Sequence, residues 1–407
     1  MFRTNAYWLI PFFAAVLLIA FGGIGFGEVL HGISGDTAIN PLKILVLFIS
    51  VAVLSIFLDE TGFFRYLANA VLKKSGSSQI KLFTAFYITI SFVTVFTSND
   101  IIILTFTPFL CHFGKNAKID PIPYLFSAFV AANTCGMALI IGNPTNIYLA
   151  TANGIDFLTY LKVMALPTLF AFTAAYFALL LLFAKRLKLS FSPNPEELKI
   201  ENKLFFYISF ALLFLCTLLL AISSYLGIEM WQIAFFSACV LTAAVLLVCL
   251  VKRYRPEELR RTLKRIPYQL VPFVLSMFVI VLTLEKYEIT AKIAAILGEA
   301  NTIAVYGVSS VFFANLINNI PMSVLFSAVL QNVRPEIATA GVYAAIIGSN
   351  IGAFLTPTGA LAGIMWLSVL KKNKIDFSFQ QFVKYGLVTA IPVLSAALLG
   401  LHISLKG

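Results

Sequence analysis

The chain has 407 residues, of which 60% are hydrophobic and 12% charged, and its formal net charge is +11. Soluble domains carry about 25% charged residues, so this composition excludes an ordinary soluble enzyme or binding domain. The bases lie mainly in loops between apolar runs, which is the positive-inside pattern of membrane proteins rather than a nucleic-acid surface. We therefore expect a polytopic protein whose partner is the lipid bilayer of the cell membrane (inner or plasma membrane), with basic loops in the cytoplasm and no nucleic acid bound.

Apolar runs long enough to cross a bilayer as helices, about 17–25 residues, follow one another along most of the chain. We predict an uncleaved first span at 7–27, and further spans at 41–58, 82–98, 121–142, 162–184, 204–224, 229–251, 267–284, 302–317, 337–355 and 386–402. Three shorter runs, at 101–111, 320–330 and 359–370, are too short to cross alone and indicate half-helices or re-entrant hairpins. The predicted fold is an all-α membrane protein of about 10–12 spans.

The segments between the spans are basic or interfacial. We expect the basic segments 185–203 and 252–265 in the cytoplasm, and an amphipathic helix at 63–74 along the membrane surface. The acids at span ends, Asp59, Glu60 and Glu285, are expected to have structural roles. The five Cys lie in or beside apolar spans without metal-ligand spacing, so neither a disulfide nor a bound metal is predicted.

Matching residues recur in the same order in the two halves of the chain. The partners are 213 to 226 positions apart, and a drift this small over six pairs indicates a duplication. The pairs are Pro41 with Pro267, Asn99 with Asn319, Asn133 with Asn350, Pro144 with Pro357, Asn153 with Asn373, and Pro167 with Pro392. We predict a first helix and external loop at 1–40, a first repeat at 41–184, basic cytoplasmic loops with a linking helix pair at 185–266, and a second repeat at 267–407.

Loop charge indicates that the two repeats are inserted in opposite orientations. Residues 59–81 carry four bases and two acids, whereas the corresponding loop 285–299 carries two bases and three acids. The first loop should therefore be cytoplasmic and the second external. Inverted repeats with polar breaks at matching places are the sequence signature of secondary transporters.

Two polar breaks interrupt the apolar pattern in each repeat. A helix that stops at mid-membrane leaves free amides at one half-helix and free carbonyls at the other, and these groups bind anions, polar oxygens or cations. Packed membrane helices also use such residues for hydrogen bonds, but their paired occurrence favours a transport site. The predicted substrate-binding residues are Ser98, Asn99, Asn133, Thr134, Asn143, Thr145, Asn146, Asn318, Asn319, Ser323, Ser349, Asn350, Thr356 and Thr358.

Asp100 is the only Asp, Glu, Lys or Arg between Leu82 and Gly114. A carboxylate at membrane depth favours protonation or a bound cation, because desolvation disfavours the charged form. We predict that Asp100 couples transport to a proton, or to sodium as a bound ion, and that no other cofactor is present. A neutral, hydrogen-bonded Asp beside Asn99 is the structural alternative.

Other functional classes fit less well. The chain has no G-x-x-x-x-G-K-[ST] motif for an ATP-driven pump and no H-E-x-x-H or G-x-S-x-G motif, so no catalytic residue is assigned and an enzyme is not expected. A channel would line its pore with rings of charges or carbonyls, and an intramembrane enzyme would need a second catalytic group beside Asp100. A structural or sensory membrane protein with a degenerate site would show no flux at all.

Several strings resemble the arsenite permease family of the ion transporter superfamily, which also contains NhaD-type antiporters and citrate and dicarboxylate carriers. They are 58–64, 98–100 with 107–108, 318–321, and 348–359 with 361–370. The resemblance implies two inverted repeats, each with a re-entrant hairpin and a broken helix, alternating access driven by a proton or sodium gradient, and often a homodimer. Arsenite permeases tend to have an acid at the place of Asn350 and a base near Phe354. The cargo therefore stays open between an arsenite- or antimonite-type hydroxide and a citrate, dicarboxylate, sulfate or phosphate anion.

Overall fold

The computed structural model describes residues 8–35, 40–188, 200, 202–253 and 255–406. Every regular element in this part of the chain is a helix, so the predicted all-α class is confirmed. Among the described residues, six helical segments are long and apolar enough to cross a membrane, one of them the combined stretch Glu257–Lys286. The protein is a multi-pass membrane protein. Most of the basic segment 185–203 lies outside the described residues.

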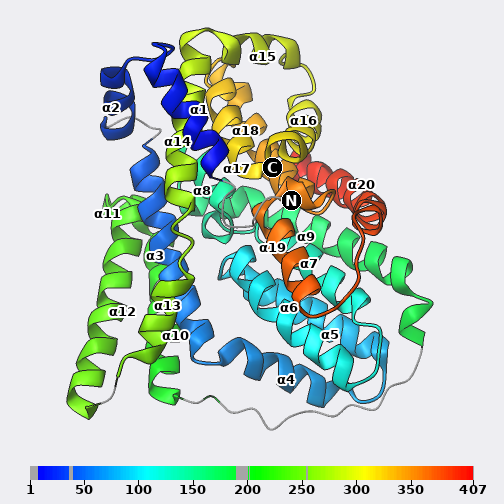
Figure 1. Ribbon diagram of the computed structural model, residues 1–407. Helices are drawn as coiled ribbons and strands as arrows, with labels where there is room; N and C mark the ends of the chain where they lie inside the picture. The colour runs from blue at the N-terminus through cyan, green and yellow to red at the C-terminus, as the bar shows by residue number, and fades with distance from the viewer. Residues whose placement is uncertain (1–7, 36–39, 189–199, 201, 254, 407) are drawn as a thin grey trace.

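The first unit begins with a long helix and contains a helical hairpin followed by a broken helix (Figure 1). Its helices are α3 (Pro41–Glu60), α4 (Phe63–Ser75), α5 (Gln79–Val95), α6 (Asn99–Asn116), α7 (Ile122–Cys135), η1 (Ile140–Gly142), α8 (Pro144–Ala152) and α9 (Phe157–Phe183). It is preceded by α1 (Leu9–Ala20) and α2 (Phe26–Ser34). It is followed by η2 (Arg186–Lys188) and the linking helices α10 (Lys203–Ala221), α11 (Ser223–Leu226), α12 (Met230–Lys252) and α13 (Glu257–Arg265).

The second unit repeats this order of elements. Its helices are α14 (Leu270–Lys286), α15 (Ile289–Leu297), α16 (Thr302–Ile317), α17 (Asn319–Leu330), α18 (Pro335–Gly352), η3 (Pro357–Gly359), α19 (Leu361–Lys372) and α20 (Phe379–Ser404). In Figure 1, α4 lies across the bottom of the molecule and α15 across the top. This placement is the one that an inverted duplication would produce, and the duplication itself stays a prediction.

The predicted first span, 7–27, is wrong as a single helix. The structure has α1, which ends at Ala20, and α2, which begins at Phe26. Gly22 between them has a φ of +74°, a left-handed conformation that a continuing right-handed helix does not allow. At 1.5 Å per residue, the 12 residues of α1 reach about 18 Å, which is short of the hydrocarbon thickness of about 30 Å.

The loops at two further places also differ from the prediction. Residues 257–265 form a helix, α13, whose Leu259 and Thr262 are buried, rather than a plain basic loop. Residues 289–297 form α15. The predicted amphipathic helix at 63–74 is present as α4, while its place on the membrane surface stays a prediction.

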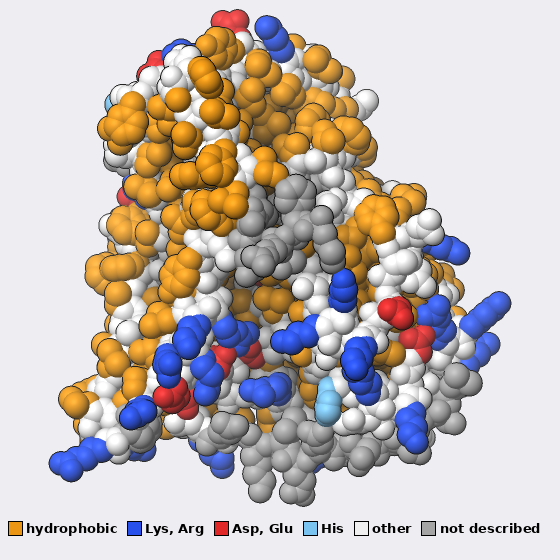
Figure 2. Space-filling view, viewed as in Figure 1, with side chains coloured by type: hydrophobic (Ala, Val, Ile, Leu, Met, Phe, Trp, Pro, Cys, Tyr) orange, Lys and Arg blue, Asp and Glu red, His pale blue; other side chains and the backbone are white. Residues whose placement is uncertain are grey.

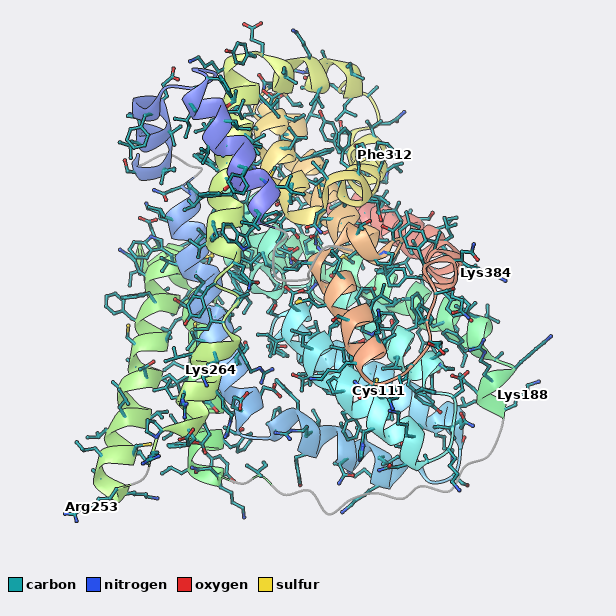
Figure 3. The ribbon with its side chains drawn as sticks, viewed as in Figure 1. Cys111, Lys188, Arg253, Lys264, Phe312 and Lys384 are labelled. Carbon is teal, nitrogen blue, oxygen red and sulfur yellow. The ribbon has the colours of Figure 1, made fainter. Side chains whose placement is uncertain are left out.

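Charge divides the molecule into two ends. Figure 2 shows Lys and Arg side chains gathered over the lower part and hydrophobic side chains over most of the upper part. Lys188 and Arg253 lie toward the lower end in Figure 3. We call this end, where α3 ends beside α13, the basic end, and the other, where α2 and α15 lie, the opposite end.

The two units pack together through half-helices and an aromatic cluster. Helix α6 contacts α19 of the other unit, and α17 contacts α8. Phe126 of α7 packs its ring against Trp366 of α19 and against Phe377, Phe382 and Tyr385, at centroid distances of 5.7–6.4 Å. Rings in such edge-on and stacked arrangements add about 0.5–1.5 kcal/mol per pair beyond burial. The broken helices of the two units are therefore held side by side.

Candidate functional site

The two broken helices meet through three buried Asn side chains. Asn143 donates a hydrogen bond from Nδ2 to Oδ1 of Asn350 at 2.9 Å, and Asn350 donates from Nδ2 to Oδ1 of Asn146 at 2.7 Å. All three side chains are buried. Asn143 is also the N-cap of α8, because its side chain accepts the amide of Thr145 at 3.2 Å and Pro144 stands at the first helical position. A polar junction thus joins the first unit to the second at the point where both helices break.

The hairpin of the first unit adds a second Asn pair beside this junction. Asn99 begins α6 and donates to Oδ1 of Asn133 at 3.1 Å, while its own Oδ1 accepts the amide of Asp100 at 2.8 Å. Gly136 connects the two groups, because its carbonyl accepts Nδ2 of Asn146 at 2.8 Å. A Cβ on Gly136 would lie 3.2 Å from Cβ of Asn99. We call these five Asn residues (99, 133, 143, 146 and 350) the central Asn network.

Four buried hydroxyl groups accompany the central Asn network and have no hydrogen-bond partner among the described residues. They belong to Ser98, Thr134, Thr145 and Ser349, and each is the immediate chain neighbour of a network Asn. An unsatisfied buried polar group costs about 1–3 kcal/mol. Four such groups around one network are candidate hydrogen-bond partners for a polar ligand.

Asp100 lines a cavity of about 450 Å³ at the basic end, beside Ser98, the chain neighbour of Asn99. One wall carries Ser98 and Asp100 of the hairpin, and another carries Lys264, Arg265 and Gln269; Figure 3 labels Lys264 on α13. The Asp100 side chain has no hydrogen bond or ion pair to any residue in the described part of the chain. The alternative of a hydrogen-bonded Asp100 side chain beside Asn99 is not seen among these residues, because Asp100 bonds the Asn99 side chain through its backbone amide.

The second hairpin break forms a separate polar group. Asn318 donates to the carbonyl of Thr358 at 3.1 Å, and Thr356 donates to Oδ1 of Asn315 at 2.6 Å. Asn318 and Thr358 line an apolar cavity of about 660 Å³ beside α1. No hydrogen bond among the described residues connects this group with Asn350.

Two further predicted residues lie at the start of α17. Asn319 and Ser323 are both buried, and the Ser323 hydroxyl donates to the carbonyl of Ile320 at 2.7 Å. The structure therefore brings the predicted residues of the first unit together with Ser349 and Asn350. It places Asn318, Thr356 and Thr358 apart from them. The roles of all these residues in binding stay predictions.

Comparison with known proteins identifies the family. The family model described as citrate transporter matches residues 5–345. The chain belongs to the citrate transporter family. Among curated relatives, the arsenical pump membrane protein of Escherichia coli strain K12 is 28% identical over 379 residues, covering 88% of this chain and 86% of its own length. That of Yersinia enterocolitica is 28% identical over 377 residues, with 88% and 86% covered. A 46 kDa membrane protein of Mycobacterium leprae is 24% identical over 392 residues, with 92% and 88% covered.

This member of the citrate transporter family also has a charged cluster that sequence reasoning missed. Arg265 lies 2.6 Å from carboxylate oxygens of both Asp59 and Glu60, and Arg261 lies 2.7 Å from Glu60. Thr105 of α6 donates to Asp59 at 2.8 Å. The acids at the end of an apolar span were a visible signal, but their partners are about 200 residues away in the chain. The cluster ties the hairpin, α3 and α13 together at the basic end.

Proposed function

We propose that this protein is a secondary active transporter that exports a neutral hydroxide of the arsenite or antimonite type in exchange for protons, by alternating access. One observation carries the proposal: the central Asn network combines amides and unsatisfied hydroxyls with a single carboxylate, Asp100, in a cavity that reaches one end of the molecule. The names of the curated relatives support the cargo class.

The chemistry of the centre favours a neutral cargo. Amide and hydroxyl groups both donate and accept hydrogen bonds, as the hydroxyls of an undissociated arsenite do. No Lys or Arg belongs to the network or to its four neighbouring hydroxyl residues. The bases Lys264 and Arg265 line the Asp100 cavity on another wall, so a tricarboxylate held at the network itself would depend on helix dipoles or a bound cation. A neutral solute avoids the cost of moving an unpaired charge through the bilayer.

Asp100 supplies the coupling. With the basic end in the cytoplasm, its cavity opens inward, and a protonated Asp100 releases its proton there while cargo enters. A protonated carboxyl crosses with the empty site more easily than a carboxylate, because desolvation favours the neutral form. Export of cargo and entry of protons are then linked by one side chain.

The test is arsenite flux in proteoliposomes with an imposed pH gradient. Asp100→Asn removes the titrating group and is expected to lower proton-driven arsenite flux by about 100-fold, the lower range for loss of a positioned proton-transfer group. Ile320→Val changes the equivalent position of the second unit and is expected to retain the flux. Wild-type flux in Asp100→Asn would refute the assignment of Asp100.

A cation-coupled carrier for an organic or inorganic anion is the second candidate. The family description supports it. The half-helix N-termini of α6, α8 and α17 also support it, because they begin at or beside Asn99, Asn143 and Asn319 and place the positive ends of their helix dipoles at the breaks. Sodium-dependent uptake of labelled citrate that Asn319→Ala abolishes would favour this candidate. Arsenite flux without citrate uptake would exclude it.

A further inference from the structure

Glu285 lies in a cavity at the opposite end of the molecule. The cavity has a volume of about 620 Å³ and is lined by α2, α8, α14 and α17, including Glu28, His31, Tyr148 and Gln331. Glu285 is only partly exposed, yet its carboxylate has no hydrogen bond or ion pair within the described residues. An acid at a span end that merely anchors a helix would be expected to face the solvent or a basic partner.

Tyr148, which lines this cavity, lies on the same helix as a residue of the central Asn network. It is 3% exposed and belongs to α8, which also carries Asn146. The cavity of Asp100 lies at the basic end and is lined by Ser98, the chain neighbour of Asn99. Each end of the molecule thus has a cavity lined by an element that also carries or adjoins a network Asn, and each cavity contains a carboxylate without a partner among the described residues.

The two units differ in which of their acidic side chains has a bonding partner. Asp59 lies 18 residues after Pro41, and Glu285 lies 18 residues after the matching Pro267. Asp59 is bound by Arg265 and Thr105, whereas the Glu285 carboxylate has no such partner among the described residues. Asp100 has Ile320 at the equivalent place of the second unit. Each unit therefore keeps one unpaired, cavity-lining carboxylate, at positions that do not correspond.

We propose that Glu285 is a proton-binding residue of the outer pathway, which takes up the coupling proton from the external solution before it reaches Asp100. This inference rests on the proposed proton-coupled transport. The carboxylate accepts one proton from water in the cavity, becomes neutral, and gives it up again toward the centre past Tyr148. No bond other than O–H is made or broken.

The other titratable groups around Glu285 are few. Glu28 of α2 pairs with Lys286 at 2.9 Å. His31 and Tyr148 line the same cavity. Helix α15 carries Lys292, α3 carries Lys43 and, at its far end, Asp59 and Glu60, and the described parts of α1 and α17 carry no titratable side chain. Glu285 is the carboxylate of this cavity that lacks a basic partner.

The test measures arsenite flux in proteoliposomes while the pH is varied only on the side of α2 and α15. Wild-type flux is expected to rise as this pH falls. Glu285→Gln should lose the dependence and Glu285→Asp should retain a shifted one. Glu288→Gln, an exposed acid three residues away, is the matched control and should follow the wild type. An unchanged profile in Glu285→Gln would overturn the inference.

The two proposals fail in different ways. Wild-type flux that is independent of pH on both sides would refute proton coupling itself, whereas pH-dependent flux that Glu285→Gln leaves unchanged refutes only the role of Glu285. Carbodiimide labelling of the unmutated protein, read by mass spectrometry, is a second measurement that does not depend on the folding of a variant. Glu285 should be labelled increasingly as the pH falls, and absence of label at every pH would contradict its protonation.

Discussion

The two units of this transporter have the same order of helices but different polar chemistry. In the first unit the hairpin break contains Asp100, and its residue Asn99 bonds Asn133 of the broken helix. In the second unit Asn318, at the hairpin break, donates to the carbonyl of Thr358 beside an apolar cavity. Asn350 of the second unit bonds Asn143 and Asn146 of the first. The polar centre therefore belongs mainly to the first unit, and the second contributes Asn350 and Ser349.

If the two units arose by the predicted duplication, this difference is how one order of helices came to support asymmetric transport chemistry. Both units have backbone breaks at matching places. A single difference, Ile320 where the first unit has Asp100, leaves the carboxylate at the hairpin break of the first unit alone. Family members with the same backbone breaks can then differ in cargo and coupling ion, because fold does not fix function.

The largest effect is expected from the equivalent pair Asn350 and Asn133. Asn350→Ala leaves the buried amide of Asn143 and the buried carbonyl of Asn146 each without this partner, at about 1–3 kcal/mol per unsatisfied group. Asn133→Ala leaves only Asn99 without its partner and should cost less. The free energy of unfolding in detergent measures both, with the exposed Asn332→Ala as control. Equal losses would remove the asymmetry between the units.

A second comparison uses the glycines of the two broken helices. A Cβ on Gly142 would overlap the carbonyl oxygen of Gly136, and one on Gly359 would lie 2.6 Å from that of Gly352. Alanine should destabilise by about 1–3 kcal/mol at both positions. Gly142→Ala should in addition reduce arsenite flux more, because Gly136 also holds Asn146. Gly27→Ala, with nothing within 4 Å, is the control, and equal flux in the two variants would contradict the ranking.

A smaller effect on stability is expected at the acids at the span ends, because Asp59 and Glu60 share a basic partner and Glu285 has no ion pair among the described residues. Arg265→Gln leaves Asp59 and Glu60 without their shared base and should destabilise by about 1 kcal/mol, a value reduced because the Arg265 side chain is 34% exposed. Glu285→Gln removes no ion pair and should change the unfolding free energy less. Thermal unfolding of both variants checks the order, and a larger loss in Glu285→Gln would reverse it.

The smallest effect concerns an exposed ion pair of the second unit, Glu299 with Arg334 at 2.6 Å. The backbone amide and guanidinium of Arg334 lower the pKa of the Glu299 carboxyl. A lowered pKa in the folded state means that the stabilisation is present above the usual value of about 4.3 and is lost as the pH falls through the folded pKa. The difference in unfolding temperature between wild type and Glu299→Gln should therefore shrink on acidification. A difference that grows instead would contradict this sign.

The sequence predicted the helices well where the apolar pattern and its stops agree. The predicted 302–317 is α16, and 320–330 is α17 apart from its first residue, because Asn318 and Asn319 mark the break between them. The prediction of the first span failed at Gly22, because the length of the apolar run was given more weight than the four glycines near its end. The helix α13 was missed because its charged face dominates its composition, while its buried Leu259 and Thr262 are few.

The centre of the site was predicted as a set of residues but not as a network. The Asn residues were visible because they interrupt apolar runs. Which of them bond to each other depends on packing between helices that lie 207 positions apart in the chain, and no local periodicity encodes that choice. The separate position of Asn318, Thr356 and Thr358 was hidden for the same reason.

The bond between Asn143 and Asn350 also matters during synthesis. The partner of Asn143 is 207 residues further along the chain, and at about 5–20 residues per second a ribosome needs about 10–40 s to reach it. For that time the first unit sits in the membrane with polar side chains that no helix has yet covered. A chain that stops before residue 350 lacks the partner that both Asn143 and Asn146 have in the complete protein.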